Sequence, residues 1–195
     1  METSDLSIAK FLFEIGTLRK VPRMHGQTFL VSDLTDNIAT HSFRVPFIAW
    51  MIARGEGLDL YKTVMMAIMH DLSETRTGDH NWVHKRYVKI EENQIIDEQL
   101  GSLPNNDLYL LAKEYGARKT REAIAAKDAD LIDQILLIRE YAHQGNTEAA
   151  RWLEADRSQR RIDALKLATS KKIAKAILAT AVYDWWKDLY TNVNK

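Results

Sequence analysis

The chain has 195 residues, of which 46% are hydrophobic and five are tryptophan, so it can form one globular domain with a sizeable core. Lysine plus arginine and aspartate plus glutamate number 27 each, and this balance argues against a nucleic-acid polymer or an anionic membrane as the partner. Cysteine is absent, which excludes disulfides and thiolate metal sites, so any metal must bind to His, Asp or Glu.

Glycine and proline interrupt the chain rarely, with eight and three copies, and apolar residues recur at intervals of three and four. This pattern is typical of amphipathic helices, so we predict an all-α protein whose residues 1–195 form a single domain. The polar residues 1–5 lack the features of a signal peptide, and no apolar run reaches the roughly 20 residues that span a bilayer. We therefore expect a soluble, cytoplasmic protein with no membrane partner.

The predicted elements are taken in chain order. A first helix is expected over residues 4–16, and a loop is expected over residues 18–36. Further helices are predicted over residues 37–55, 59–71, 87–100, 106–115, 120–143, 147–158 and from there to Tyr190. Pro46 lies inside the second predicted helix and is expected to kink it just after His41. The charged tract 157–161 is expected to be a solvated helix face, with a binding patch as the alternative.

His70 and Asp71 stand at the end of the apolar run 64–69, where a packed core can give way to a pocket. Adjacent side chains on a helix diverge by about 100°. This pair can therefore share a metal ion only if further ligands come from other helices. His41, early in the segment 37–55, is one candidate, although alone it is more simply a capping or hydrogen-bonded histidine.

The segment 120–143 supplies the candidate acids Asp128, Asp130 and Asp133. Asp130 stands among alanine, leucine and isoleucine residues that suit close helix packing. A carboxylate that points into such surroundings needs compensation, which a divalent cation or a salt bridge provides. From the residues alone all three acids stay open as ligands.

Four segments carry a resemblance to a known family. They are residues 37–42 (NIATHS), 70–74 (HDLSE), 77–79 (TGD) and 126–130 (AKDAD). In this order and at these separations they resemble the HD-domain metal-dependent phosphohydrolases, and within them the 5′-deoxynucleotidase-like group. The resemblance spans about residues 9–145. It implies an HD-domain helical bundle with this metal-site core, on which the C-terminal helices 147–190 pack.

The resemblance implies one divalent metal ion bound by His41, His70, Asp71 and Asp130, and it favours Asp130 over the two other acids. Two histidines and two carboxylates do not select one metal, so Co, Mn, Fe, Ni, Zn and Mg are all candidates. The family favours Co or Mn. It also implies a homodimer or a larger homo-oligomer. The C-terminal aromatic residues are expected either to fill the core or to form a dimer contact; they are Tyr183, Trp185, Trp186 and Tyr190.

Two further acids are predicted to be catalytic. Glu74 follows His70 by four residues and stands on the same side if the helix continues, where it can hold or deprotonate the metal-bound water. Asp79 follows Gly78, which allows the backbone to turn the carboxylate back towards the site. It can protonate the leaving oxygen or bind a substrate hydroxyl. The simpler alternatives are an exposed glutamate and an ordinary turn aspartate.

Three residues are predicted to bind the substrate. Arg23 and Lys85 match family positions that bind phosphate, and the guanidinium of Arg23 suits bidentate recognition. Trp82 can stack on a base, although a lone tryptophan more often packs in a core. Where the family often has glutamate before the first ligand histidine, this chain has Thr40. Many members have prolines after the TGD motif, where this chain has residues 80–84 (HNWVH), so the substrate preference stays open. His80 and His84 can be extra ligands or can support the ligands.

The expected activity is that of a metal-dependent phosphomonoesterase that converts deoxyribonucleoside 5′-monophosphates to deoxynucleoside and phosphate. One alternative is a dNTP triphosphohydrolase, which shares the whole metal motif. The alternative from another class is a non-catalytic HD module that binds a nucleotide. The chain keeps all four predicted ligands and both predicted catalytic acids: His41, His70, Asp71, Asp130, Glu74 and Asp79. This argues against the non-catalytic module, because a protein without catalysis is free to lose any of them.

Overall fold

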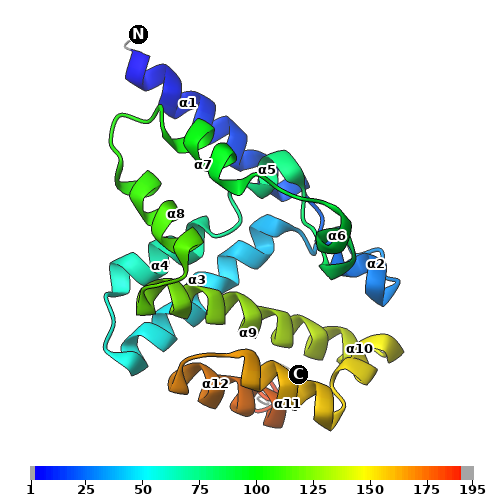
Figure 1. Cartoon of the computed structure of the whole chain (residues 1–195). Coiled ribbons are helices and arrows are strands. Elements are labelled where there is room, and N and C mark those ends of the chain that lie inside the picture. Colours follow the sequence, from blue (N-terminus) through cyan, green and yellow to red (C-terminus); the bar gives the residue numbers. More distant parts are fainter. Residues whose placement is uncertain (1–2, 190–195) are drawn as a thin grey trace.

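The computed structural model describes residues 3–189, and every regular element in this range is a helix (Figure 1). In chain order they are α1 Thr3–Ile15, the 3₁₀ helix η1 Gly16–Lys20, α2 His25–Phe29, α3 Ile38–Glu56, α4 Leu60–Met69, α5 Glu74–Thr77, α6 Trp82–Tyr87, α7 Glu92–Leu100, α8 Asp107–Ala117, α9 Arg121–His143, α10 Thr147–Trp152, α11 Ala155–Ala164 and α12 Ala168–Ala179. None of these helices is long and apolar enough to cross a membrane. The all-α prediction is confirmed.

The long helix α9 lies in the middle of the fold, with α11 and α12 below it and α8 above it in Figure 1. Helices α3 and α4 pack against each other and against α9. Four alanines of α9 are fully buried, and their small side chains let the neighbouring helices approach closely; they are Ala123, Ala125, Ala126 and Ala129. This close packing brings together the candidate ligands, which come from α3, from the turn after α4 and from α9.

Side-chain caps fix where the central helices begin. The Asn37 side chain accepts a hydrogen bond from the Thr40 backbone N–H at 3.1 Å, and the Thr40 hydroxyl accepts one from the Asn37 backbone N–H at 3.2 Å. Thr40 thus completes a capping box at the position where the family often has glutamate. Asp59 and Thr120 cap α4 and α9 more simply, since each side chain accepts one hydrogen bond, from the backbone N–H of Lys62 and of Ala123.

Several predicted boundaries are wrong. The segment 18–36 is not one loop, because it contains most of η1 and all of α2. The predicted helix 87–100 starts too early, because Val88 adopts an extended conformation and α7 begins only at Glu92, and the short helix α6 before it was not predicted. The predicted helix 147–158 breaks at Leu153 and Glu154, and Glu154 is extended and precedes α11. Helix α12 ends at Ala179, far short of the predicted end.

The C-terminal aromatic residues do not fill the core. Tyr183, Trp185 and Trp186 are 45%, 77% and 44% exposed, so the core-filling alternative is wrong for these three. Tyr190 lies outside the described residues. Trp185 instead lines a cavity of about 440 Å³ between α9 and α12. The division into a metal-site core at residues 9–145 and a C-terminal part that packs on it stays a prediction.

Candidate metal centre

Three of the four predicted ligands meet at the carboxyl end of α4. This helix ends at Met69, so His70 and Asp71 lie in the turn that follows it and not in the helix as predicted. His41 comes from the first turns of α3, directly behind the Asn37 cap. One ligand atom from each of His41, His70 and Asp71 lies within 4.8 Å of the others. The side chains of both histidines are almost fully buried, at 1% and 0% exposure.

Asp130, on α9, completes the group. Its Oδ1 lies 3.3 Å from His41 Nε2 and 3.8 Å from His70 Nε2. Asp71 Oδ2 lies 3.4 and 3.0 Å from the same two nitrogens. The other oxygen of Asp130 accepts a hydrogen bond from Lys127 at 2.6 Å, one helical turn earlier. The fourth predicted ligand therefore lies beside the other three.

The hydrogen bonds of the two histidines show why a cation fits this site. His41 Nδ1 lies 2.6 Å from Asp133 Oδ2, and His70 Nδ1 lies 2.8 Å from the Ala67 carbonyl oxygen, so both Nδ1 atoms act as donors to acceptors. In the neutral form that binds a metal, the two Nε2 atoms carry the lone pairs, and they face each other at 3.0 Å. Without an ion, burial acts to lower the pKa of His41, but hydrogen bonds to Asp130, Asp133 and Asp71 raise it well above its usual value. Ligand nitrogens of a tetrahedral zinc site lie about 3.3 Å apart, because each is about 2.0–2.1 Å from the ion. A divalent cation would satisfy both lone pairs and the two carboxylates.

The two alternative acids have other partners. Asp133 is 3% exposed and is held by His41 and by Arg44, so it orients the His41 ring and is not itself in the group of clustered ligand atoms. Asp128 is 1% exposed and accepts hydrogen bonds from the backbone N–H groups of Lys166 and Leu167 at 3.0–3.1 Å. It fixes the connection between α11 and α12.

The charges of the cluster shift its pKa values strongly. Burial acts to raise the pKa of Asp71, but the His70 charge and hydrogen bonds from both histidines hold it well below its usual range. Burial likewise opposes ionisation of Asp130, and Lys127 and His41 outweigh it and lower the pKa. Both carboxylates are therefore ionised at neutral pH. Two buried anions beside two imidazoles are the donor set that a hard or borderline divalent cation requires.

Arg23, Glu74, Asp79, Lys85 and Trp82 all line one cavity of about 200 Å³ together with Asp71 and Asp130. The structure thus brings every sequence-predicted catalytic and substrate-binding residue to the same opening. Arg23 is only 8% exposed, and its Nη1 lies 3.6 Å from Asp71 Oδ2. Burial opposes the charge of Arg23, but Asp79 and Asp71 outweigh it and raise the pKa. Trp82 is 48% exposed, so it is not a core residue.

Glu74 is the least compensated acid in the cavity. The chain leaves α4 before it, and Glu74 begins the short helix α5, so the unbroken helix assumed from the sequence is wrong. Burial, Asp71 and Asp79 raise the pKa of Glu74 to about 9. Its Oε2 is buried and has no hydrogen-bond partner among the described residues. Such an orphaned oxygen indicates a water or a cation as its partner.

Asp79 has a structural partner that the sequence did not indicate. Its Oδ2 accepts a hydrogen bond from the Met24 backbone N–H at 2.6 Å, across 55 residues of sequence. Asn81 donates to the Met24 carbonyl oxygen at 3.1 Å. Together they hold the segment that carries Arg23 against the start of α6. Asp79 therefore holds in place the segment that carries Arg23, whatever it does in the reaction.

Sequence reasoning missed several residues around the ligands. Arg44 on α3 bridges Asp133 and Glu140 and so anchors the aspartate that orients His41. Lys127 was visible only as part of the motif, although its spacing of three from Asp130 is that of a helical ion pair. His80 and His84 pack ring against ring at 5.5 Å, and neither belongs to the cluster of ligand atoms. His25 is buried, and burial and Arg23 lower its pKa to about 4.

A family model described as an HD domain matches residues 15–170, which is most of the chain. This chain belongs to the HD-domain family. A Dictyostelium discoideum protein named 5′-deoxynucleotidase HDDC2 is 29% identical over 125 residues, with 57% of this chain and 66% of that protein covered. The human protein of the same name is 27% identical over 141 residues, with 69% and 68% covered. The chain spans about two thirds of the length of these relatives.

Solved structures agree with this family assignment. A Pyrococcus horikoshii protein is 25% identical and superposes with a TM-score of 0.70, covering 88% of this chain and 98% of that one. A cyanophage S-2L HD phosphohydrolase, solved with dA and one catalytic Zn²⁺ ion, is 18% identical with a TM-score of 0.54 and covers 86% and 93%. The second likeness concerns the fold. The predicted HD-domain bundle and the predicted enzyme class, a metal-dependent phosphohydrolase, are confirmed.

Proposed function

We propose that this HD-domain protein is a phosphomonoesterase that requires a divalent metal and hydrolyses deoxyribonucleoside 5′-monophosphates to deoxynucleoside and phosphate. The observation that carries the proposal is the position of the buried Arg23 beside the His–Asp cluster, in one cavity with Lys85 and Trp82. This arrangement combines a cation site, a phosphate-binding guanidinium and an aromatic surface. The name 5′-deoxynucleotidase, borne by relatives at 24–30% identity, supports the substrate class.

His41, His70, Asp71 and Asp130 are proposed to hold one divalent ion. Bound there, the ion supplies Lewis acidity, because it polarises a phosphoryl oxygen and makes a coordinated water more acidic. Mixed imidazole and carboxylate ligands accept Co, Mn, Fe, Ni, Zn or Mg. Cobalt or manganese is the first choice from the family resemblance, and reconstitution with single metals distinguishes them.

Arg23 and Lys85 are proposed to bind the phosphate. Arg23 presents its donors in a fixed planar fork, and its burial strengthens charge-assisted hydrogen bonds to phosphate oxygens. Lys85 is exposed at the rim and adds a mobile positive charge. Trp82, the first residue of α6, is half exposed, lines the cavity and offers a face on which a base can stack.

Glu74 is proposed to orient the attacking water and take its proton. Without an ion its pKa is about 9, and a cation on the neighbouring ligands opposes this rise because opposite charge favours the carboxylate. Glu74 is then ionised beside the water that it is proposed to activate. Asp79 is proposed to protonate the leaving 5′ oxygen or to bind a sugar hydroxyl with the oxygen that Met24 does not occupy.

The rival triphosphohydrolase has one supporting observation. A cavity of about 120 Å³ adjoins the cluster and is lined by four basic residues, Lys85, Lys113, Arg118 and Lys127. Two of them are already neutralised, since Lys113 pairs with Asp97 and Lys127 pairs with Asp130. Fewer free positive charges are left to bind a triphosphate, and this favours the monophosphate as the substrate. Incubation of metal-loaded protein with dAMP and dATP tests it: phosphate from dAMP supports the proposal, triphosphate from dATP supports the rival, and binding without hydrolysis supports the non-catalytic module.

A homodimer is proposed through an exposed stripe on α3. Four large apolar side chains follow one another at helical spacing and are 43–71% exposed; they are Phe43, Phe47, Trp50 and Met51. Apolar surface of this kind is usually covered by a partner. Sedimentation of Phe47→Asp should show the monomer, whereas Tyr61→Asp, exposed on α4, should sediment as wild type. An unchanged Phe47→Asp would place the interface elsewhere. A cytoplasmic location stays a prediction.

A further inference from the structure

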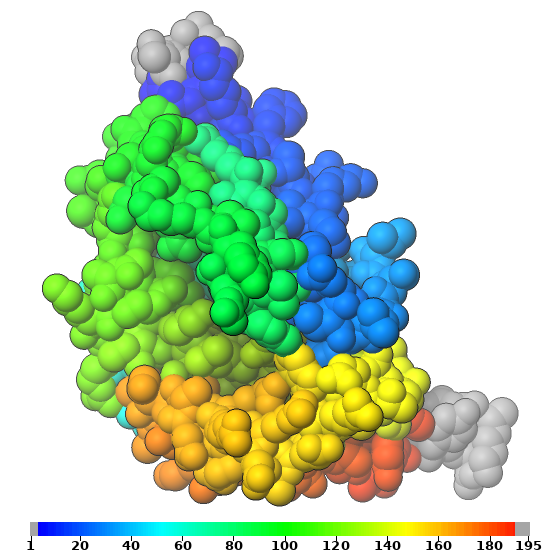
Figure 2. Space-filling model, turned by 45° about the vertical axis from the view of Figure 1, so that its right-hand side comes forward, coloured from blue at the N-terminus to red at the C-terminus, as the bar shows by residue number. Residues whose placement is uncertain are grey.

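The charged tract at residues 157–161 borders a second cavity next to the metal centre. This cavity has a volume of about 570 Å³ and shares Trp82, Leu131 and Gln134 with the metal cavity; its remaining wall is formed by Trp152, Arg157, Arg160, Arg161 and Ala164. Figure 2 shows the surface hollowed between the green segment that carries α6 and the yellow and orange segment that carries α10 and α11. We call this cavity the arginine groove.

The positive charge of the arginine groove is not neutralised. Arg157 and Arg160 are exposed, and neither has an ion-pair partner among residues 3–189. Arg161 donates hydrogen bonds to the backbone carbonyl oxygens of Trp152 and Arg157 at 2.9 and 3.1 Å. It pairs with no carboxylate in the part of the chain that the structure describes. Burial and the charge of Arg157 lower the pKa of Arg161, as expected where like charges are concentrated. The groove therefore offers an anion more than one charge-assisted hydrogen-bond donor.

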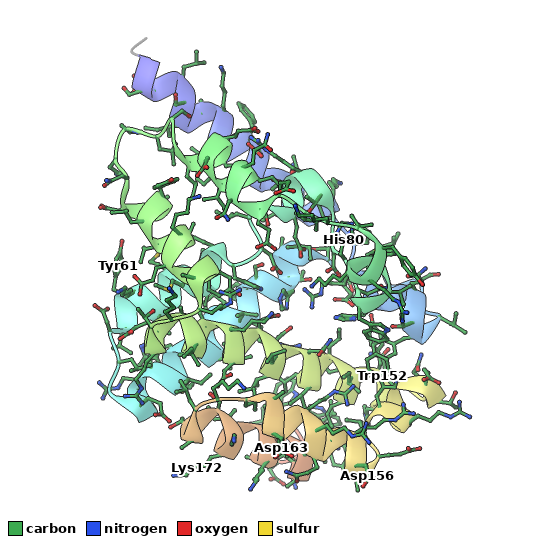
Figure 3. The ribbon with its side chains drawn as sticks, viewed as in Figure 1. Tyr61, His80, Trp152, Asp156, Asp163 and Lys172 are labelled. Atoms are coloured by element: carbon green, nitrogen blue, oxygen red, sulfur yellow. The ribbon has the colours of Figure 1, made fainter. Side chains whose placement is uncertain are left out.

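The aromatic side of the arginine groove is rigid and continuous with the metal cavity. Trp152 is 8% exposed and packs edge to face against Phe29, with ring centres 4.8 Å apart. Its ring also lies against Trp82, with ring centres 4.6 Å apart and an angle of 36° between the ring planes. The Arg161 guanidinium lies 5.1 Å from the Trp152 ring centre. Figure 3 shows Trp152 on the α10 side of this region and His80 on the α6 side. A group that lies on Trp82 thus has the metal centre at one end and the arginines at the other.

We propose that the arginine groove is a second phosphate subsite, which binds a phosphate on the far side of the nucleoside from the 5′ phosphate that is hydrolysed. This inference rests on the proposed nucleotidase function and narrows its substrate class. The nucleoside lies across Trp82, the 5′ phosphate lies at Arg23, and a 3′ phosphate lies at Arg157 and Arg160. A phosphate on the 3′ oxygen occurs in a deoxynucleoside 3′,5′-bisphosphate. It also occurs as the first phosphodiester of a short 5′-phosphorylated oligonucleotide.

The test compares three substrates of the metal-loaded full chain: dAMP, deoxyadenosine 3′,5′-bisphosphate and the 5′-phosphorylated dinucleotide pdApdA. Release of the 5′ phosphate is measured as kcat/KM for each substrate. Two charge-assisted hydrogen bonds to the second phosphate should raise kcat/KM over dAMP by about tenfold or more. The gain should shrink as salt is added, because both arginines are exposed and screened.

The Arg157→Gln/Arg160→Gln variant should lower the ratio of bisphosphate to dAMP kcat/KM to near one. Arg19→Gln removes an exposed arginine from η1, away from the groove, and should leave this ratio unchanged. Preference for the bisphosphate alone assigns the groove to a terminal phosphate, and equal preference for pdApdA assigns it to a phosphodiester as well.

Equal kcat/KM for dAMP and the bisphosphate in wild type, or a preference that survives in the double variant, would overturn the subsite while the nucleotidase stands. Failure to release phosphate from all three substrates would instead contradict the proposed function, and the subsite would fall with it.

Discussion

Asp128 and Asp130 lie two residues apart on α9, and their replacement by alanine should have different consequences. Asp128 is buried at 1% exposure and accepts hydrogen bonds from two backbone donors, at Lys166 and Leu167. A hydrogen bond to a charged group contributes about 1.5–3 kcal/mol. Since Lys166 is exposed and water can reach its N–H, we expect Asp128→Ala to lower the free energy of unfolding by about 3 kcal/mol.

This loss corresponds to a Tm lower by roughly 6–12 °C for a domain of this size. Asp130→Ala removes the pairs with Lys127 and His41 that favour the ionised carboxylate, so it should also lower the Tm in chelator. The two variants differ in their response to added metal: wild type and Asp128→Ala should gain stability, and Asp130→Ala should gain little.

Calorimetry of both variants in chelator and in metal, with bound metal measured by mass spectrometry, tests this pair. Asp163→Ala is the matched control, since Asp163 is an exposed aspartate on α11 whose side chain accepts a hydrogen bond from Gln159 and from no other side chain among residues 3–189. If Asp128→Ala lost the metal and Asp130→Ala kept it, the assignment of the ligand on α9 would be wrong.

The remaining predictions concern the cavity. Glu74→Gln should keep the metal and slow turnover on the order of a hundredfold or more, measured as kcat beside metal content; metal loss would make Glu74 a ligand. In chelator, wild type should lose stability relative to Glu74→Gln as the pH rises from 4.5 towards about 9, because folded Glu74 keeps a proton that the unfolded chain releases. Urea midpoints across this range measure it, and a constant difference would refute it. Arg23→Gln should lower kcat/KM for dAMP about tenfold or more, and an unchanged value would remove Arg23 from phosphate binding.

The helices and the ligand motif could be predicted because both are local patterns. The caps at Asn37, Asp59 and Thr120 and the small residues of α9 are legible in the sequence, and so are the spacings around His41 and His70. These features depend on residues within a few positions of one another.

The supports of the site could not be predicted, because they join distant segments. Asp133 reaches His41 across 92 residues, and Asp79 reaches Met24 across 55. The tract 157–161 was expected to be a solvated face in preference to a binding patch, because no local sequence pattern shows that α11 borders the same hollow as α6. The break at Leu153 and Glu154, which sets the place of α11, carries neither glycine nor proline.

The central claim is that the His–Asp cluster holds a divalent ion that the hydrolysis of deoxynucleoside monophosphates requires. The most direct measurement is phosphate release from dAMP by metal-stripped protein, with Co, Mn, Mg or Zn added singly, for wild type and Asp71→Ala. The account predicts release by wild type that a chelator abolishes and that Asp71→Ala lacks together with its bound metal. Full activity of Asp71→Ala, or of wild type in chelator, would contradict it.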